Sequence, residues 1–395
     1  MPEKAKVPAI RFKGFNDAWE QRRLGEIGST FTGLSGKTKE DFGHGTAKII
    51  TYMNVFSNSI ADPNGTENVE IDSQQNVVKY GDALFTTSSE TPEEVGMSSI
   101  WLENQPNVYL NSFCFGFRPT IEFHPYYLGF MLRSPSVRKK FIFLAQGISR
   151  YNISKNKSMD MTVPVCTIDE QRRLGTFFKD MDNLITLHQR KLLKLKNVKK
   201  AMLEKMFPKN GSSVPEIRFA GFTDAWEQRK VKDVCKISTG KSNTQDRIED
   251  GIYPFYVRSP IIERSNRYLY EEEAVLTVGD GVGTGKVYHY VNGKYDLHQR
   301  VYRMFDFKNG TLAKYFYHHF SNHFYDRVMA MTAKTSVDSV RYEMISEMDI
   351  EVPSEKEQAK IIGYLDNLDN LITLHQRKLE KLRNIKKSML EKMFI

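Results

Sequence analysis

The stretch from Gly279 to Lys286 is the clearest candidate for chemistry, because it holds four glycines and ends in a lysine. Glycine-rich loops cradle phosphates when their spacing is that of a P-loop. Here Asp280 stands where the first P-loop glycine is needed, and Val287 stands where a serine or threonine would hold magnesium. The spacing therefore predicts either a hairpin tip after a strand or a loop whose bare backbone can approach a DNA groove.

Three histidines, His318, His319 and His323, place two imidazoles four residues apart on an expected helix. A zinc site needs a third ligand, and hydrolytic zinc sites of this spacing also carry the glutamate of an H-E-x-x-H pattern. Neither is evident, and the aromatic neighbours favour a helix that packs on a domain core. We expect no metal site here.

Signatures of catalysis are missing from the rest of the sequence. The Asn/Asp-Pro-Pro-Tyr/Phe motif of adenine methyltransferases does not occur, nor does a glycine motif for S-adenosylmethionine after an early strand. The three cysteines lack C-x-x-C spacing, which argues against disulfides and thiolate zinc. We expect no catalytic residue and no cofactor on this chain, no signal peptide, no membrane span and a cytoplasmic location.

Polar side chains that can donate to phosphates and base edges gather in several loops. Two of these stretches combine arginine with tyrosine, and a solvated loop is the alternative interpretation for each. The remaining polar residues, near the starts of two long inserts, are weaker candidates. The predicted contact residues are Lys37, Thr38, Thr51, Tyr52, Asn54, Ser149, Arg150, Tyr151, Asn152, Lys241, Ser242, Arg258, Ser259, Gly281, Gly283, Lys286, Lys334, Thr335, Ser336, Arg341 and Tyr342.

The elements that must position these residues are duplicated. Residues 7–22 return as 214–229 with 13 of 16 positions identical, and residues 182–207 return as 369–394 with 22 of 26 identical. The long inserts between these copies barely resemble each other. Duplicated frames with divergent inserts indicate two different readers held in one symmetric geometry.

The later repeat predicts long helices. Thr167 with Glu170, and Ser354 with Glu357, fit the capping box at a helix start. An apolar stripe follows in each copy, as expected for helices that pack on each other or on equivalent partner surfaces. The stripe residues are Leu192, Leu195, Val198, Met202 and Met206, with Leu379, Leu382, Ile385, Met389 and Met393 in the second copy.

We therefore expect a mixed α/β fold with a pseudo-two-fold internal repeat. Two globular domains are separated by two long antiparallel helices that form a coiled-coil-like spacer. The expected boundaries are 1–162 for the first domain, 163–207 for the first helix, 208–351 for the second domain and 352–395 for the second helix.

Each insert ends in a proline followed by Glu-Gln, at Pro164 with Glu170-Gln171 and at Pro353 with Glu357-Gln358. Each helix repeat opens with Asp-Asn-Leu-Ile. In this combination, over nearly the whole chain, the sequence resembles the specificity subunits of type I restriction–modification systems of bacteria and archaea.

The resemblance implies a subunit without catalytic activity. Its two target-recognition domains would each read one half of a bipartite, asymmetric target in double-stranded DNA, and the paired helices would fix the gap. Two copies of an adenine methyltransferase subunit would dock on the helices and use S-adenosylmethionine. Restriction subunits would join to translocate and cleave DNA with ATP and magnesium.

The physical quantities agree with that implication. A helix of 26 residues spans about 39 Å, or about one turn of duplex. The net charge of +9 is concentrated in the helix repeats, which carry seven Lys or Arg against two and three acids. This charge suits a polyanion but is equally a solvated helix face. Two alternatives remain open: a helical adaptor whose inserts bind proteins, and an enzyme that uses the glycine loop on nucleotides.

Overall fold

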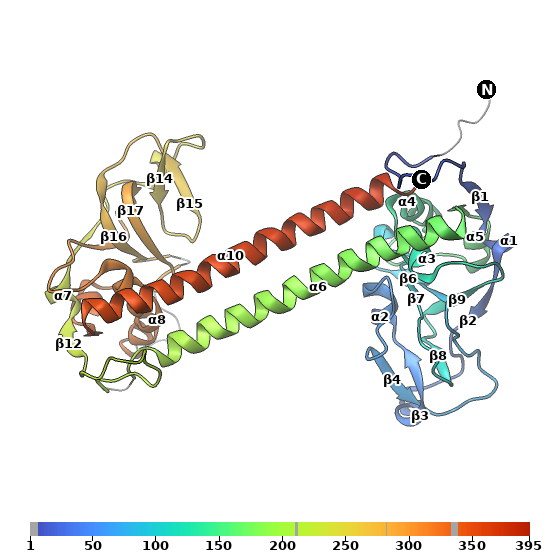
Figure 1. Ribbon diagram of the computed structural model, residues 1–395, viewed down its shortest axis with the longest axis horizontal. Coiled ribbons are helices and arrows are strands. Elements are labelled where there is room, and N and C mark those ends of the chain that lie inside the picture. Colours follow the sequence, from blue (N-terminus) through green and yellow to red (C-terminus); the bar gives the residue numbers. More distant parts are fainter. Residues whose placement is uncertain (1–6, 210–211, 282, 333–338) are drawn as a thin grey trace. The chain divides into compact units, whose positions relative to one another are not determined.

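The structure is a computed structural model that describes residues 7–209, 212–281, 283–332 and 339–395. The chain divides into two compact units, Met1–Gln189 with Arg377–Ile395, and Arg190–Gln376. Two helices of 38 residues, α6 (Ile168–Lys205) and α10 (Glu355–Lys392), each contribute one part to each unit (Figure 1). Both helices lie inside the segments predicted for them.

In the first unit, strands run in the order β2-β9-β5-β7, with a neighbouring sheet β4-β3-β8 and a separate β1-β11 pair. These strands are β1 (Glu20–Arg23), β2 (Gly28–Thr32), β3 (Phe42–Ile50), β4 (Thr66–Val69), β5 (Ala83–Thr86), β6 (Ser88–Ser89), β7 (Ser98–Ile100), β8 (Val108–Leu110), β9 (Cys114–Pro119), β10 (Tyr151–Asn152) and β11 (Thr162–Val165). The helices are α1 (Leu24–Ile27), α2 (Tyr52–Ser57), α3 (Pro125–Leu132), α4 (Pro135–Leu144) and α5 (Lys155–Met159), with short 3-10 turns at Lys39–Asp41 and Pro92–Glu94.

In the second unit, one six-stranded sheet has the order β13-β18-β16-β17-β14-β15, beside a β12-β19 pair. These strands are β12 (Glu227–Lys230), β13 (Lys236–Thr239), β14 (Tyr253–Tyr256), β15 (Ile262–Ser265), β16 (Tyr270–Val278), β17 (Tyr288–Leu297), β18 (Val301–Phe305) and β19 (Asp349–Val352). The helices are α7 (Val231–Val234), α8 (Ala313–Ala330) and α9 (Tyr342–Ser346), with a 3-10 turn at Thr244–Asp246.

The two inserts share this topology although their sequences diverge. In the first insert β7 pairs with β5 and β8 pairs with β3. In the second, the long strand β17 pairs with both β16 and β14, so it corresponds to β7 and β8 together. Gly33 and Gly240 occupy equivalent positions, directly after β2 and β13. A Cβ at Gly33 would lie 2.1 Å from the carbonyl oxygen of Asn111, and one at Gly240 would lie 2.1 Å from that of Leu297. Only glycine allows either backbone to approach so closely.

A buried ion pair joins each copy of the N-terminal repeat (residues 7–22 and 214–229, the frame of each insert) to a long helix. Arg11 donates from Nε and Nη2 to the two carboxylate oxygens of Glu170, at 2.7 and 2.8 Å, and Arg218 binds Glu357 with the same two distances. Both carboxylates are 1% exposed. Trp19 adds a bond from Nε1 to Glu170 at 3.0 Å. These contacts correct the side-chain half of the predicted capping box, because both carboxylates bind arginine. The other half is present at the second helix, where the Glu357 N–H donates to the Ser354 hydroxyl at 3.4 Å.

The glutamine after each glutamate forms hydrogen bonds that connect the long helix to the insert. Gln171 accepts the backbone N–H of His124, just before α3, at 3.0 Å, and donates to the carbonyl of Cys166. Gln358 accepts from Leu312, just before α8, at 2.8 Å, and donates to Pro353. The Glu-Gln pair of the sequence therefore joins three parts of each unit: the frame, the insert and the long helix.

The far end of each long helix returns to the frame of a unit. Ile10 donates its N–H to the carbonyl of Lys392 at 3.0 Å in the first unit, and Ile217 does the same to Lys205 at 2.8 Å in the second. The stripe residues near these ends pack into the core of their own unit, Met202 and Met206 in the second and Met389 and Met393 in the first. The stripe is thus largely intra-unit, and Ile385 remains 37% exposed.

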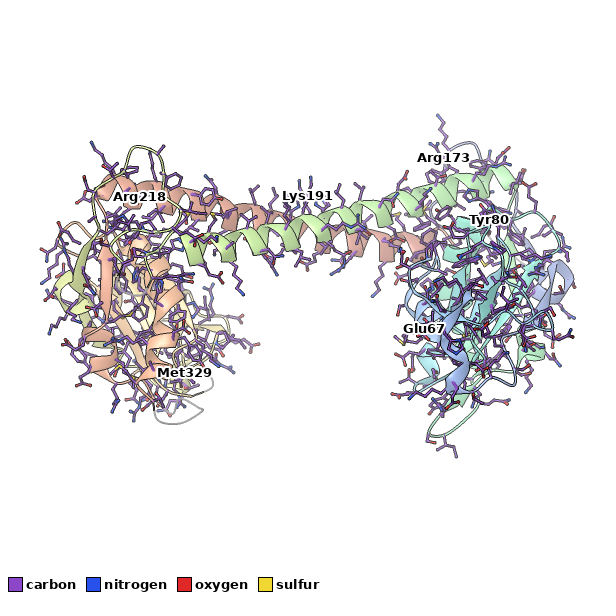
Figure 2. The ribbon with its side chains drawn as sticks, turned by 90° about the horizontal axis from the view of Figure 1, so that it is seen from below. Glu67, Tyr80, Arg173, Lys191, Arg218 and Met329 are labelled. Carbon is purple, nitrogen blue, oxygen red and sulfur yellow. The ribbon has the colours of Figure 1, made fainter. Side chains whose placement is uncertain are left out.

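Within each unit the antiparallel helix segments are joined by an ion pair. Lys386 on α10 lies 2.5 Å from Asp182 on α6 in the first unit, and Lys199 lies 2.5 Å from Asp369 in the second. These lysines bind the neighbouring helix, whereas Lys191 lies on an exposed part of α6 (Figure 2). None of the described helices is long and apolar enough to span a membrane.

His318 and His319 of α8 lie in the core of the second unit, as their aromatic neighbours predict, and His323 is half-buried beside them. His319 Nε2 lies 2.7 Å from the Glu351 carboxylate, and burial lowers the pKa of His318 and of His323 to about 4. Nowhere in the described parts of the chain do three His, Cys, Asp or Glu side chains come together as a metal site would need.

The first prediction concerns the frame ion pair. Glu170→Ala should lower the free energy of unfolding by about 3 kcal/mol, because it leaves Arg11 and the Trp19 N–H without their buried acceptor. Urea unfolding of the purified chain measures this. Asp169→Ala is the matched control, since that side chain is 76% exposed and pairs with Arg172 on the surface; it should change stability by less than about 0.5 kcal/mol. Equal effects of the two substitutions would contradict the assignment.

The second prediction concerns pH. His318 and His323 stay neutral in the fold, whereas unfolded histidines take up protons below a pKa of 6.5. The contribution of these two histidines to stability should therefore be constant above that pH and fall as the pH drops from 6.5 towards about 4. His318→Phe should flatten this fall, because Phe130 occupies the equivalent place in the first unit, three residues after the matching tyrosine. Urea unfolding at a series of pH values tests it, and identical slopes for variant and parent would refute it.

Candidate nucleic-acid interface

In the second unit, predicted contact residues meet at one end of the sheet. Gly279 follows β16 and donates its N–H to the carbonyl of Arg300 at 2.9 Å, and it accepts from Val340 at 2.7 Å. These backbone bonds bring the glycine-rich loop, the turn before β18 and the segment before α9 together. Arg258, two residues past β14, reaches the same place and lies 3.4 Å from the Asp280 carboxylate.

Asp280 holds two arginines at this edge. Its other carboxylate oxygen lies 3.7 Å from Arg300 Nε. The side chains of Arg258 and Arg300 are 47% and 65% exposed, whereas that of Asp280 is 26% exposed. The carboxylate therefore attracts two guanidinium groups, with Arg258 within hydrogen-bond distance and Arg300 beyond it, and both keep most of their N–H donors towards solvent.

The glycine-rich loop joins β16 and β17 as a hairpin, one of the two structures predicted from its sequence. Gly281 has φ +89° and is exposed, so its backbone is accessible. Gly283 is buried, and a Cβ there would meet Val287 at 2.6 Å, so this glycine serves packing. Lys286 is exposed and lies 4.6 Å from the ring centre of Tyr325.

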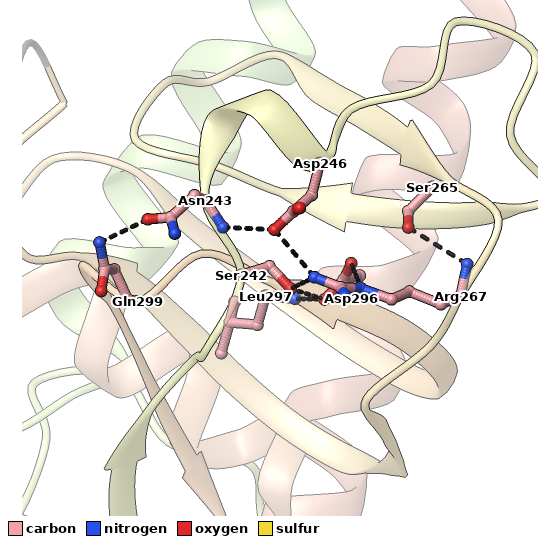
Figure 3. A network of polar contacts seen from close by, with 8 residues as sticks. All are labelled: Ser242, Asn243, Asp246, Ser265, Arg267, Asp296, Leu297 and Gln299. Atoms are coloured by element: carbon pink, nitrogen blue, oxygen red, sulfur yellow. Dashed lines mark hydrogen bonds and ion pairs between the residues drawn. The ribbon is translucent and has the colours of Figure 1, made fainter.

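Ser242 occupies an interior position. Its hydroxyl donates to the buried Asp296 at 2.5 Å and accepts from Arg267 at 3.0 Å, and Arg267 also binds Asp246 (Figure 3). This network closes the end of β17, and Ser242 has no surface to offer a ligand. Its neighbour Lys241 is exposed.

The other predicted contact residues of the second unit differ in their exposure. Arg341 and Tyr342, at the start of α9, are both exposed, with Tyr342 at 47%. Ser259 is half-buried, and its hydroxyl bonds to Ile261. Lys334, Thr335 and Ser336 lie outside the described residues.

In the first unit, a hollow of about 350 Å³ lies at the corresponding end of the sheet. Tyr52 lines it, stacks on Phe56 and donates its hydroxyl to the carbonyl of Ser88 at 2.6 Å. Met53 and Phe113 border the same hollow and are 60% and 58% exposed. Apolar side chains this exposed beside a polar rim are typical of a contact surface.

The remaining candidates of the first unit fall into two groups. Ser149, Arg150 and Asn152 are exposed, Tyr151 is half-buried, and Arg150 lines the hollow. By contrast, Asn54 is 4% exposed, and its amide bonds to Asp62, Gly65 and Asn58.

Three weaker candidates also have structural partners. Thr51 caps α2, Lys37 lies 2.8 Å from Asp72, and the backbone N–H of Thr38 donates to Asp41 at 2.7 Å. We leave Asn54, Ser242 and Gly283 out of the proposed interface because all three are buried. Four residues near the remaining candidates were not predicted from the sequence: Met53, Phe113, Asp280 and Arg300.

Comparison with known proteins identifies the chain. Residues 16–197 and 223–384 match the family described as the type I restriction modification DNA specificity domain. The chain belongs to this family. The resemblance, the mixed α/β fold with two domains and long helices, and the assignment as a DNA-specificity subunit are thereby confirmed, and the adaptor alternative is not favoured.

Individual relatives of this specificity subunit are distant. The putative type I restriction enzyme MjaX specificity subunit of Methanocaldococcus jannaschii is 22% identical and covers 94% of this chain and 92% of its own length. The MjaVIII specificity subunit of the same organism is 25% identical over 65% and 67%. The crystal structure of a type I S subunit from M. genitalium has a TM-score of 0.66 at 13% identity and covers 99% of both chains, which shows the shared fold.

A third prediction separates interior from surface residues. Ser242→Ala should lower the free energy of unfolding by about 1–3 kcal/mol, because it removes a hydrogen-bond donor from the buried Asp296. Lys241→Ala, at the exposed neighbouring position, should change it by less than about 0.5 kcal/mol. Urea unfolding of both variants tests this, and a Ser242→Ala variant as stable as the parent would show that the network contributes nothing.

Proposed function

We propose that this subunit reads a bipartite, asymmetric target in double-stranded DNA, with one half-site for each recognition domain. One observation carries the proposal: the same strand order is built twice in near-identical frames, while the side chains differ in the loops at one end of each sheet. We call this end the loop edge; it holds Tyr52, Ser88 and Phe113 in the first unit and Arg258, Asp280 and Arg300 in the second. A duplicated reader with unchanged side chains would favour two equal half-sites. Side chains that differ between equivalent loops favour two different ones.

The chemistry belongs to partner subunits in this proposal. Two copies of an adenine methyltransferase subunit would bring S-adenosylmethionine, and restriction subunits would translocate and cleave DNA with ATP and magnesium. The specificity subunit itself would bind DNA, hold these partners and supply no catalytic group.

Exposed leucines on the long helices support a partner that binds twice. Leu184 and Leu187 are each 46% exposed in the first unit. Their copies Leu371 and Leu374 are 43% and 44% exposed in the second. An apolar pair that stays exposed at the same place in both copies fits two identical partners better than two different DNA half-sites.

The fourth prediction tests the split reader by methylome sequencing of cells that express the chain with its methyltransferase subunit. We expect methyladenine in a two-part motif. Exchange of residues 23–162 for the insert of another specificity subunit should change only one half of that motif, because the frame contacts lie outside the exchanged segment.

Two outcomes would count against this function. New methylation without a two-part motif would exclude the split reader. No methylation by a complex shown to be assembled would exclude DNA specificity. As an independent check, DNA affinity should fall steeply with salt, because lysines and arginines displace counterions from phosphates.

A further inference from the structure

Equivalent positions in the two recognition domains can be found from their backbone pairing. Ile50 lies opposite Leu110 at the end of β3, and Tyr256 lies opposite Leu297 at the end of β14. Both pairs are parallel and immediately precede the loop edge. The second residue after each strand therefore occupies the same place. These residues are Tyr52 in the first domain and Arg258 in the second.

A second position follows from a short antiparallel contact. Ser88 lies opposite Asn152 in the first domain, and Asp280 lies opposite Ser339 in the second. In the first domain Ile153 donates its N–H to the carbonyl of Thr87 at 3.0 Å. In the second, Val340 donates its N–H to the carbonyl of Gly279 at 2.7 Å. Ser88 and Asp280 are therefore equivalent.

A third position is fixed by one more backbone bond. Thr87 donates its N–H to the carbonyl of Phe113 at 2.9 Å, and Gly279 donates to that of Arg300 at the same distance. Each acceptor lies in the turn before the equivalent strands β9 and β18. We call Tyr52, Ser88 and Phe113 the first triad, and Arg258, Asp280 and Arg300 the second triad.

The second triad has the chemistry of a guanine contact. Arginine donates two parallel N–H bonds to the O6 and N7 acceptors of guanine, and discrimination improves when the guanidinium is held in place. Asp280 lies 3.4 Å from Arg258 and 3.7 Å from Arg300, so one carboxylate attracts both guanidinium groups while they remain exposed. An aspartate alone would repel the phosphate backbone, but here two cations outnumber it.

The first triad has a different chemistry at the same place. Exposed Phe113 and Met53 offer an apolar wall, which suits the C5-methyl group of thymine. Glu90 and Glu94 line the same hollow and, when ionised, only accept hydrogen bonds. An A·T pair presents both a methyl group and the N6 amino group of adenine in the major groove, whereas a G·C pair presents no methyl group.

We propose that the two triads carry the base contacts of the two domains, the second selecting a G·C pair through Arg258 and Arg300 and the first an A·T pair through Phe113. Ser88 is 8% exposed, and its carbonyl positions Tyr52. The proposal rests on the DNA-reading function proposed above. It explains how one fold reads two half-sites: the backbone positions are fixed, and three side chains are exchanged.

The fifth prediction is read from methylomes of the full complex. Arg258→Ala and Arg300→Ala should each relax one G·C position of the second half-site by about tenfold or more, because a bidentate contact is lost. The first half-site should stay unchanged. Phe113→Ala should relax an A·T position of the first half-site only. Arg247→Ala is the matched control, as an arginine of the second domain paired with Glu263 and outside the triad; it should leave both half-sites unchanged.

Binding by the purified wild-type complex decides the same question without a variant that could fail to assemble. Replacing one guanine of the second half-site by 7-deazaguanine removes the N7 acceptor and should weaken binding by about tenfold. Replacing the contacted thymine of the first half-site by uracil removes one methyl group and should weaken it by about fourfold.

The outcomes separate the two proposals. A wild-type complex without a two-part motif overturns the DNA-reading function itself. A two-part motif that is unchanged in Arg258→Ala, Arg300→Ala and Phe113→Ala overturns the triads. If a variant abolishes methylation altogether, the modified duplexes decide: undiminished binding with every second-half guanine replaced, or every first-half thymine replaced, overturns the corresponding triad.

Discussion

The bidentate pair between a frame arginine and the first-turn glutamate of a long helix is the interaction on which each unit depends. A carboxylate that is 1% exposed is stable only if donors replace its lost water. Arg11 and Arg218 supply those donors from segments 159 and 139 residues away in the sequence. The adjacent glutamines bind the backbone before α3 and α8. Frame, insert and helix therefore meet at two consecutive residues, and neither residue can change without loosening all three parts.

With that junction fixed, the inserts are free to diverge where function needs it. The strand order is kept by backbone hydrogen bonds and by close approaches such as that at Gly33 and Gly240, which involve no particular side chain elsewhere. The loop edge carries its side chains on backbone positions fixed by these same bonds. Phe113 and Arg300 occupy equivalent positions. Replacing one type of side chain by the other therefore alters what the loop edge can bind without altering how the domain folds. In the proposed model, specificity and stability are located in different residues.

The sequence predicted what repetition and periodicity encode: the two long helices, the two domains and the core role of the α8 histidines. It failed where a side chain's partner is remote. Glu170 and Glu357 looked like cap residues because the capping pattern is local, whereas their arginines are not. Ser242 looked like a loop hydroxyl, but its partner Asp296 is 54 residues away. Arg300 and Phe113 were missed because no motif marks their turns, and only strand register shows that they are equivalent.

The identity of the helix repeats has its own physical cause. Lys199 and Asp182 are copied as Lys386 and Asp369, and each lysine binds the aspartate of the opposite helix. Each copy therefore supplies one cation and one anion, and each is satisfied only by the other copy. A substitution in one helix would leave a half-buried charge on the other without its partner, so the pairing favours copies that stay alike. The long inserts, by contrast, barely resemble each other in sequence.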